Sequence, residues 1–205
     1  TAISSLGDVR GKTIYASGKG SSPEFALRYL LAENGIDPDQ DVTLEWKSEA
    51  TEVVALLAQT PGMIAMLPQP YVAVAQGKVP GLNMAVDLNA VWKDLDNGSL
   101  MITGVLVGRK DFVEQYKSQV KTFLEEYEAS TRLANESIPE TAVLTEKYGI
   151  VAAAAAEKSI PQCNITDLAG AEMKTALSGY LEVLKAQNAK SVGGQLPDDA
   201  FYFQP

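Results

Sequence analysis

Short runs of β-branched and apolar residues alternate with stretches of helical periodicity along the first half of the chain. The β-branched runs predict strands at residues 12–17, 42–46 and 63–67. Apolar side chains at helical spacing predict helices at residues 25–33, 51–59 and 71–76. This alternation is typical of βαβ units on a parallel sheet, so we expect an α/β fold.

The second half of the chain has a different pattern, with one strand followed by several helices. The strand is predicted at residues 100–107, and helices are predicted from residue 111 and at residues 140–148, 151–158 and 171–187. A polar segment at residues 93–98 carries turn signals, so we divide the chain into residues 1–101 and 102–205. Because one strand cannot form a sheet, this strand must join the first sheet or pair with strands outside the chain.

Two of the predicted helices begin with the pattern of a capping box. Ser21 is followed by Glu24, and Asp111 is followed by Glu114. The helix that begins at Asp111 also carries an apolar stripe, which predicts that it packs on another element. The stripe consists of Val113, Tyr116, Val120, Phe123, Leu124 and Tyr127.

Glycine and hydroxyl residues lie between the first predicted strand and the first predicted helix. Backbone N–H groups at such a turn can point at a ligand, and the helix dipole favours an anion. Lys19 adds a positive charge. A plain turn would have the same pattern, so this loop is a candidate ligand contact. Its residues are Ser17, Gly18, Lys19, Gly20, Ser21 and Ser22.

A proline-rich turn follows the third predicted strand. Pro68-Gln69-Pro70-Tyr71 places an amide and a phenol where that strand ends. Ligands of open α/β folds bind beyond the carboxyl ends of the strands. Gln69 and Tyr71 are therefore further candidate contacts, although the turn also fits a stiff connection into the next helix.

Composition and charge exclude several classes of function. Hydrophobic residues make up 46% of the chain, which is ordinary for a packed protein, and the net charge of -9 makes nucleic acid an unfavourable partner. The chain has no His and one cysteine, Cys163, which removes imidazole-based triads and cysteine-rich zinc sites. We find no catalytic pair, and we expect neither a metal nor a cofactor.

Three other segments resemble ligand-binding motifs but lack the residues or the spacing that these motifs require. Residues 7–13 resemble a P-loop, but their glycines are one residue too close together and the segment precedes a strand. The acidic segments at residues 37–41 and 94–98 lack the Gly and Glu positions of a calcium loop. We interpret the first as a turn that leads into a strand and the two acidic segments as solvated turns.

Several segments, in order along the chain, resemble one known family. They are residues 6–14 (LGDVRGKTI), 20–24 (GSSPE), 30–36 (LLAENGI), 63–71 (MIAMLPQPY), 105–112 (VLVGRKDF) and 193–199 (GGQLPDD). Together they resemble ABC-transporter substrate-binding proteins of the NMT1-like group, which includes nitrate-, sulfonate- and taurine-binding members. The resemblance covers essentially the whole chain.

The resemblance implies a periplasmic-binding-protein-like fold of type II, in which two hinged lobes close on a small solute. Residues 1–101 would form most of the ligand-distal lobe, and residues 102–205 would return as the helical part of the first lobe. The remainder of that lobe and a lipoprotein anchor or signal would then lie upstream. The protein would bind a solute outside the cytoplasm and deliver it to membrane permease subunits. In this family Ser21, Ser22, the N–H groups of residues 20–22 and Gln69 would contact the solute.

Other functions remain open at this point. An enzyme of the pyrimidine-precursor or menaquinone type is the main alternative, because it would share the scaffold. A regulatory effector-binding domain fits the long helical half less well. The solute itself is not determined by the sequence, since hydroxyls and backbone donors serve many anions. Apolar faces left by absent strands could also support dimerisation or strand exchange.

Overall fold

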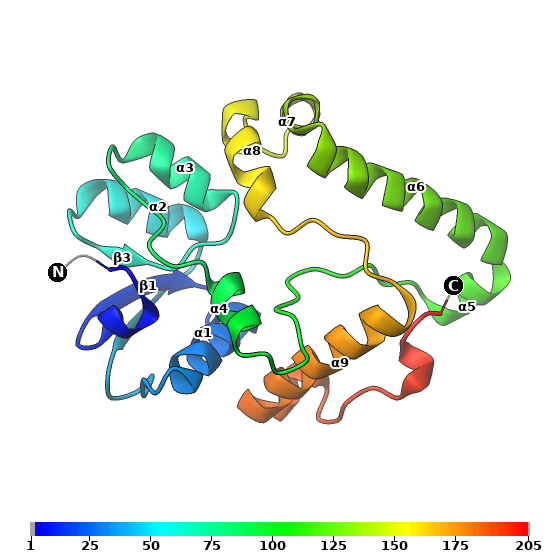
Figure 1. Cartoon of the computed structure of the whole chain (residues 1–205), viewed down its shortest axis with the longest axis horizontal. Coiled ribbons are helices and arrows are strands. Elements are labelled where there is room, and N and C mark those ends of the chain that lie inside the picture. The colour runs from blue at the N-terminus through cyan, green and yellow to red at the C-terminus, as the bar shows by residue number, and fades with distance from the viewer. Residues whose placement is uncertain (1–2, 205) are drawn as a thin grey trace.

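The computed structural model describes residues 3–204, and its first half is built on a three-stranded parallel sheet. The strand order is β2-β1-β3, with β1 (Thr13–Ser17), β2 (Thr43–Lys47) and β3 (Ile64–Ala65). Figure 1 shows this sheet at the N-terminal end of the molecule. The α/β class and the three predicted strands of the first half are therefore confirmed.

The third strand is shorter than the five residues predicted for it. The N–H of Met66 still donates to the carbonyl of Tyr15 over 2.8 Å, so pairing with β1 continues just beyond β3. Pro68 then follows, and proline has no N–H to extend a ladder. The strand therefore gives way to a turn at the carboxyl edge of the sheet.

Four helices belong to the first half of the chain. They are α1 (Ser22–Glu33), α2 (Ala50–Gln59), α3 (Tyr71–Lys78) and α4 (Leu88–Asp94). The first three confirm the predicted helices. The sequence pattern did not predict α4, which begins because the carboxylate of Asp87 accepts hydrogen bonds from the N–H groups of Asn89 and Ala90.

The main core lies where α1 and α4 pack on the sheet. Leu30 and Leu31 of α1 and Trp92 of α4 are all 0% exposed, and they share a cluster with Ile14 of β1. The indole N–H of Trp92 donates to the hydroxyl of Ser99 over 3.0 Å, which satisfies the polar atom of an otherwise buried ring.

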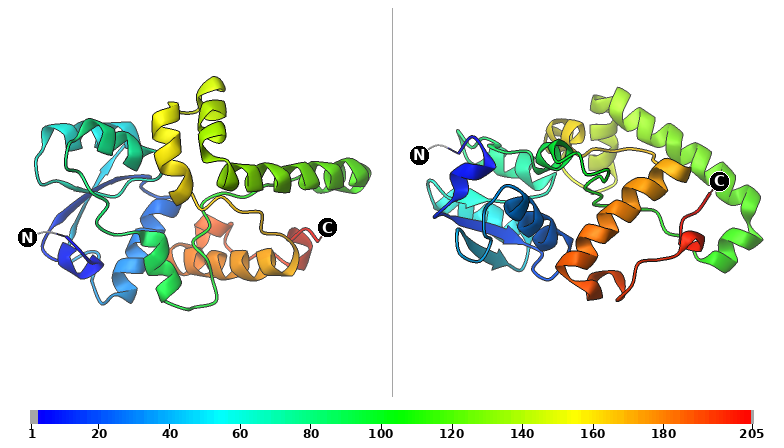
Figure 2. Two further views of the ribbon diagram at one scale, coloured as in Figure 1. Left: turned by 45° about the horizontal axis from the view of Figure 1, so that its top comes forward. Right: turned by 60° about the horizontal axis from the view of Figure 1, so that its bottom comes forward.

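The second half is helical, as predicted. Its helices are α5 (Lys110–Gln115), α6 (Lys117–Glu136), α7 (Ile138–Lys147), α8 (Ala153–Ser159) and α9 (Gly170–Gln187). The long helix expected from residue 111 is divided in two at Tyr116. Figure 2 shows that α6 projects away from the α/β half, whereas α9 returns towards it.

The predicted strand at residues 100–107 is not formed, and this prediction was wrong. The segment has no regular structure, and Val107 is 82% exposed. A strand exists only where its N–H and C=O groups pair with a neighbour, and the described sheet ends at β2 and β3. Residues 100–107 pair with neither edge.

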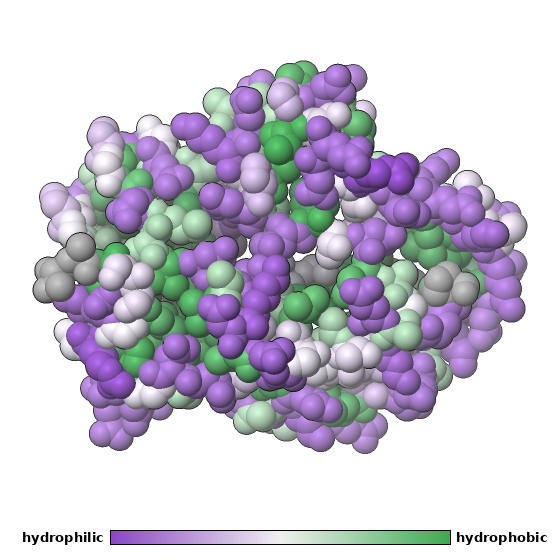
Figure 3. Space-filling model, viewed as in Figure 1, coloured by the Kyte–Doolittle hydropathy of each residue, from purple (hydrophilic) through white to green (hydrophobic). Residues whose placement is uncertain are grey.

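The apolar stripe of α5 and α6 contains no buried residue, and Thr131 is the residue of α6 that is buried. Tyr116 and Phe123 are exposed, with Phe123 at 50%, and the other four stripe residues are half-buried. Within residues 3–204 the stripe therefore does not form the buried packing surface that was expected. Figure 3 shows hydrophobic residues (green) at the surface among hydrophilic ones (purple) on this face of the molecule.

The capping box predicted at Asp111 is also wrong. α5 begins one residue earlier, with Arg109 in the N-cap position, so Asp111 lies inside the first turn. There its carboxylate accepts a hydrogen bond from the guanidinium of Arg109 over 3.0 Å. An ion pair with Arg109, two residues earlier, thus replaces the cap.

α9 connects the end of the chain to the core of the first half. Tyr180 and Leu184 of α9 are buried in the cluster that contains Leu30 and Trp92. The rings of Trp92 and Tyr180 lie with their centroids 5.5 Å apart. The division at residue 101 remains a prediction, and the core of the α/β half extends across it.

Candidate ligand-binding site

The loop of residues 18–22 connects β1 to α1 at the carboxyl ends of the strands. Gly18 has a φ of +87°, and a Cβ at this position would lie 2.9 Å from Cγ of Pro23. Both facts require glycine, because the turn is left-handed and the proline of the first helical turn packs against it. The loop therefore presents its polar residues at a fixed place next to the sheet.

Several donors of loop 18–22 already have acceptors within the chain. The hydroxyl of Ser21 donates to the carbonyl of Gly18 over 2.7 Å, and the N–H of Ser21 donates to the same carbonyl. The N–H of Gly20 donates to a carboxylate oxygen of Glu24 over 2.6 Å. The predicted capping box at Ser21 is therefore wrong, because Ser21 turns back to Gly18 and Glu24 binds the residue before the cap.

The hydrogen bond from Gly20 to Glu24 occupies one of the N–H groups that were predicted to bind a solute anion. The carboxylate of Glu24 is an anion held at the N-terminus of α1, where the helix dipole favours negative charge. A solute anion at Gly20 would compete with it. The role of residues 20–22 as solute donors remains a prediction.

The turn of residues 68–70 and loop 18–22 both follow the carboxyl ends of neighbouring strands. β1 and β3 are adjacent and parallel, with Tyr15 opposite Ala65, so the segments after them leave the same edge of the sheet. The structure therefore brings the two predicted groups of site residues to one edge. Ser17, Gly18, Gln69 and Tyr71 are half-buried there, and Lys19, Gly20, Ser21 and Ser22 are exposed.

Gln69 has an unusual environment at this edge. Its Nε2 donates to Oε1 of Gln162, which lies in the second half of the chain. Its own Oε1 is buried and has no hydrogen-bond partner among the described residues. A buried acceptor without a donor costs free energy, so this atom is the strongest polar feature of the site.

Tyr71 is placed less favourably for a ligand. It is the first residue of α3 and packs against a small apolar cluster between α2 and α3. The buried members of this cluster are Val54, Leu57 and Ala75. Packing of the ring gives Tyr71 a structural role, and its predicted contact with a solute rests on the phenol group alone.

The sequence analysis did not identify Gln162 as a site residue. Gln162 ends a short 3-10 turn, η2 (Ile160–Gln162), directly after α8. No motif or periodicity in the sequence includes Gln162. Only the packing of α8 against α3 brings it to Gln69.

A hollow of about 240 Å³ lies beside Ser22. Tyr180 of α9 forms part of its wall, together with residues of the irregular segment that precedes α5. Burial raises the pKa of the Tyr180 phenol, and a hydrogen bond with the side chain of Ser22 partly offsets this effect. Other wall residues are Ile102, Thr103, Gly104, Val105, Leu177 and Leu181, so the hollow is mainly apolar.

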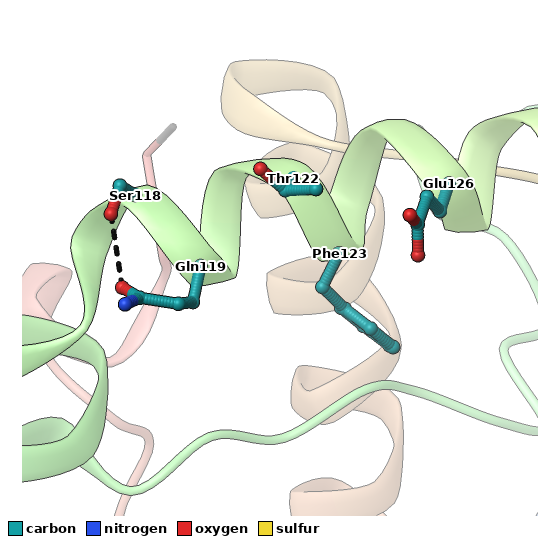
Figure 4. Close-up of a pocket in the computed structure, with 5 residues that line it drawn as sticks. All are labelled: Ser118, Gln119, Thr122, Phe123 and Glu126. Atoms are coloured by element: carbon teal, nitrogen blue, oxygen red, sulfur yellow. Dashed lines mark hydrogen bonds between the residues drawn. The ribbon is translucent and has the colours of Figure 1, made fainter.

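A second hollow lies on α6 and has no features of a binding site. Figure 4 shows that all five lining residues, from Ser118 to Glu126, come from this one helix. The hydroxyl of Ser118 is bound to the neighbouring Gln119 over 3.0 Å. Because no second element faces these side chains, the hollow is an open surface.

Residues 3–204 contain no group of three or more His, Cys, Asp or Glu side chains that could hold a metal ion. In the same part of the chain, no helix is both long and apolar enough to cross a bilayer. Cys163 is a free thiol whose pKa is raised by burial, so the thiolate is disfavoured there.

Comparison with known proteins adds a family to this geometry. No curated protein matches the chain. A crystal structure of an ABC transporter from Parabacteroides distasonis matches with a TM-score of 0.76 and 27% identity. The match covers 94% of this chain and 66% of that chain, so this chain corresponds to part of a periplasmic-binding-protein-like fold. The NMT1-like family model matches residues 4–145, and the chain therefore belongs to the NMT1-like family.

Proposed function

We propose that the protein is the solute-binding component of an ABC importer, which holds a small polar or anionic solute between two hinged lobes. The observation that carries the proposal is that loop 18–22 and turn 68–70 follow the carboxyl ends of adjacent parallel strands, where open α/β folds bind ligands. Family membership and the likeness to an ABC transporter structure support it. Binding and release by hinge motion require no chemical step.

The proposal includes the place and the partners of the protein. A component of this kind works outside the cytoplasm, in the periplasm or anchored by lipid at the cell surface, and passes its solute to permease subunits. Residues 1–101 would form most of the ligand-distal lobe, and residues 102–205 would form part of the other lobe, apart from α9, which packs in the core of the first half. An enzyme on the same scaffold is the alternative, and it would have to convert the solute that it binds.

The first experiment is native mass spectrometry of the purified protein. A stoichiometric small-molecule adduct would support the binding function and give the mass of the solute. An adduct that changes mass with time would favour the enzyme. If no adduct is carried and no solute of a nitrate, sulfonate and pyrimidine panel binds in calorimetry, the proposed function is wrong.

The site assignment is tested by Ser21→Ala and Gln69→Ala. Each should weaken binding of the identified solute by about 1–3 kcal/mol, the range for leaving a buried polar partner unpaired. Ser118→Ala on the exposed face of α6 is the matched control and should bind like the wild type. Unchanged affinity in both site variants would contradict the assignment.

Self-association is the last part of the proposal. Val105, Leu106 and Val107 are more than half exposed, and the stripe of α5 and α6 continues this apolar surface. Large exposed apolar patches mark interaction surfaces, and a second copy would cover this one. Analytical ultracentrifugation at several concentrations tests this, and a monomer throughout would exclude it.

A further inference from the structure

The segment of residues 160–165, here called the strap, joins the helical half to the α/β half. It follows α8, which packs against α3, as Figure 1 shows. Two carboxamide pairs cross between the halves at the strap. One pair is Gln69 with Gln162, and in the other Nδ2 of Asn89 donates to Oδ1 of Asn164 over 3.0 Å.

The strap also has a fixed shape on the side of the helical half. Asn164 adopts a left-handed backbone with φ +51°, and its Nδ2 donates to the carbonyl of Gln162 over 3.2 Å. Nδ2 of Asn135, near the end of α6, donates to the carbonyl of Ile165 over 3.0 Å. The strap is therefore held in place independently of Gln69, and Gln162 is presented to Gln69 on a preformed support.

The two carboxamides of the first pair are unequally satisfied. Nε2 of Gln69 donates to Gln162, whereas Oε1 of Gln69 is buried without a donor. The residue lies on turn 68–70, at the same edge as loop 18–22. An acceptor in this position selects for a molecule that brings an N–H or O–H group to it, because any other occupant leaves the oxygen desolvated and unpaired.

We propose that Gln69 and Gln162 together form a donor-selecting subsite, which takes an N–H or O–H group of the solute at Oε1 of Gln69. Gln162 acts as a positioning residue, because its Oε1 accepts from Nε2 of Gln69 and so fixes the orientation of the Gln69 carboxamide. This inference rests on the proposed function and narrows it. It excludes solutes that have only acceptor atoms, such as nitrate.

Matched pairs of probes test the class of solute. The pairs are taurine with ethanesulfonate, and uracil with 1,3-dimethyluracil, each titrated calorimetrically into the full chain. In each pair that binds, we expect the donor-bearing member to bind roughly tenfold more tightly or better, the ratio for one satisfied buried acceptor. Equal affinity within a binding pair would overturn the subsite and leave the binding function standing. If no member of either pair binds and no adduct is carried, the proposed function fails together with the subsite.

Two variants, one in each carboxamide pair, separate the positioning role of Gln162 from the general attachment of the strap. Gln162→Ala should reduce the preference for the donor-bearing probe to about twofold or less, because the carboxamide of Gln69 is then free to turn. Asn89→Ala is the control, since it removes the other carboxamide pair between the halves and leaves the hydrogen bonds that shape the strap in place. The control should retain the full preference. An equal loss of preference in both variants, or a full preference in Gln162→Ala, would contradict the positioning role.

Discussion

Removal of the Ser99 hydroxyl should destabilise the protein, because it leaves the indole N–H of Trp92 without an acceptor. The indole N–H of Trp92 donates to this hydroxyl over 3.0 Å, and Trp92 is 0% exposed. Ser99 is itself 8% exposed, so water cannot replace the lost acceptor easily. Leaving a buried donor unpaired costs about 1–3 kcal/mol, and full burial of this ring places Ser99→Ala near 2 kcal/mol. The carboxamide oxygen of Asn97 loses one donor but keeps the N–H of Ser99, so its contribution is small.

The free energy of unfolding is measured by urea denaturation followed by tryptophan fluorescence and circular dichroism. Ser118→Ala makes the same chemical change on the exposed surface of α6 and should stay within about 0.5 kcal/mol of the wild type. Trp92→Phe removes the donor, so in that background Ser99→Ala should cost much less. Equal costs in the two backgrounds, or a loss below about 0.5 kcal/mol in the wild-type background, would refute the reasoning.

Three further predictions concern other parts of the chain. Gly179→Ala should lower stability by about 1–3 kcal/mol, because a Cβ there would lie 2.8 Å from Cβ of Ser99; a normal thermal midpoint would contradict this. Asp8 has a pKa of about 2, against an ordinary 3.8, because N–H and hydroxyl groups of Ser4 and Ser5 bind its carboxylate. Its stabilising contribution is therefore present above pH 3.8 and lost as the pH falls through about 2, which NMR titration of the carboxyl carbon can follow. Cys163 should react with a thiol reagent more slowly in the folded than in the unfolded protein at pH 8, since burial raises its pKa.

Periodicity was sufficient for most elements of the fold. The β-branched run that ends at Ser17 and the apolar spacing that includes Leu27, Leu30 and Leu31 are local signals, and the structure contains the corresponding strand and helix. The order of alternation also gave the parallel sheet. Loop 18–22 and turn 68–70 lie at the same end of the sheet, because β1 and β3 are neighbouring parallel strands and their carboxyl ends point in the same direction.

The elements that failed depend on partners far away in the chain. Residues 100–107 have the composition of a strand, but a strand also needs a neighbour, and no local pattern supplies one. Gln162 has no signal of its own, because its position at Gln69 results from the packing of α8 on α3. The start of α4 could have been predicted from the sequence, since Asp87 is a favoured N-cap residue directly before Leu88.

The return of α9 has a consequence for how the protein folds. Tyr180 and Leu184 close a core whose other members, such as Leu30 and Trp92, are synthesised much earlier. During translation the apolar surface of the sheet and α1 therefore stays partly exposed until α9 has been synthesised. Such distant contacts slow folding, and they also make the two halves melt together in one cooperative transition. Deletion of α9 and the residues that follow it would therefore unfold the N-terminal sheet.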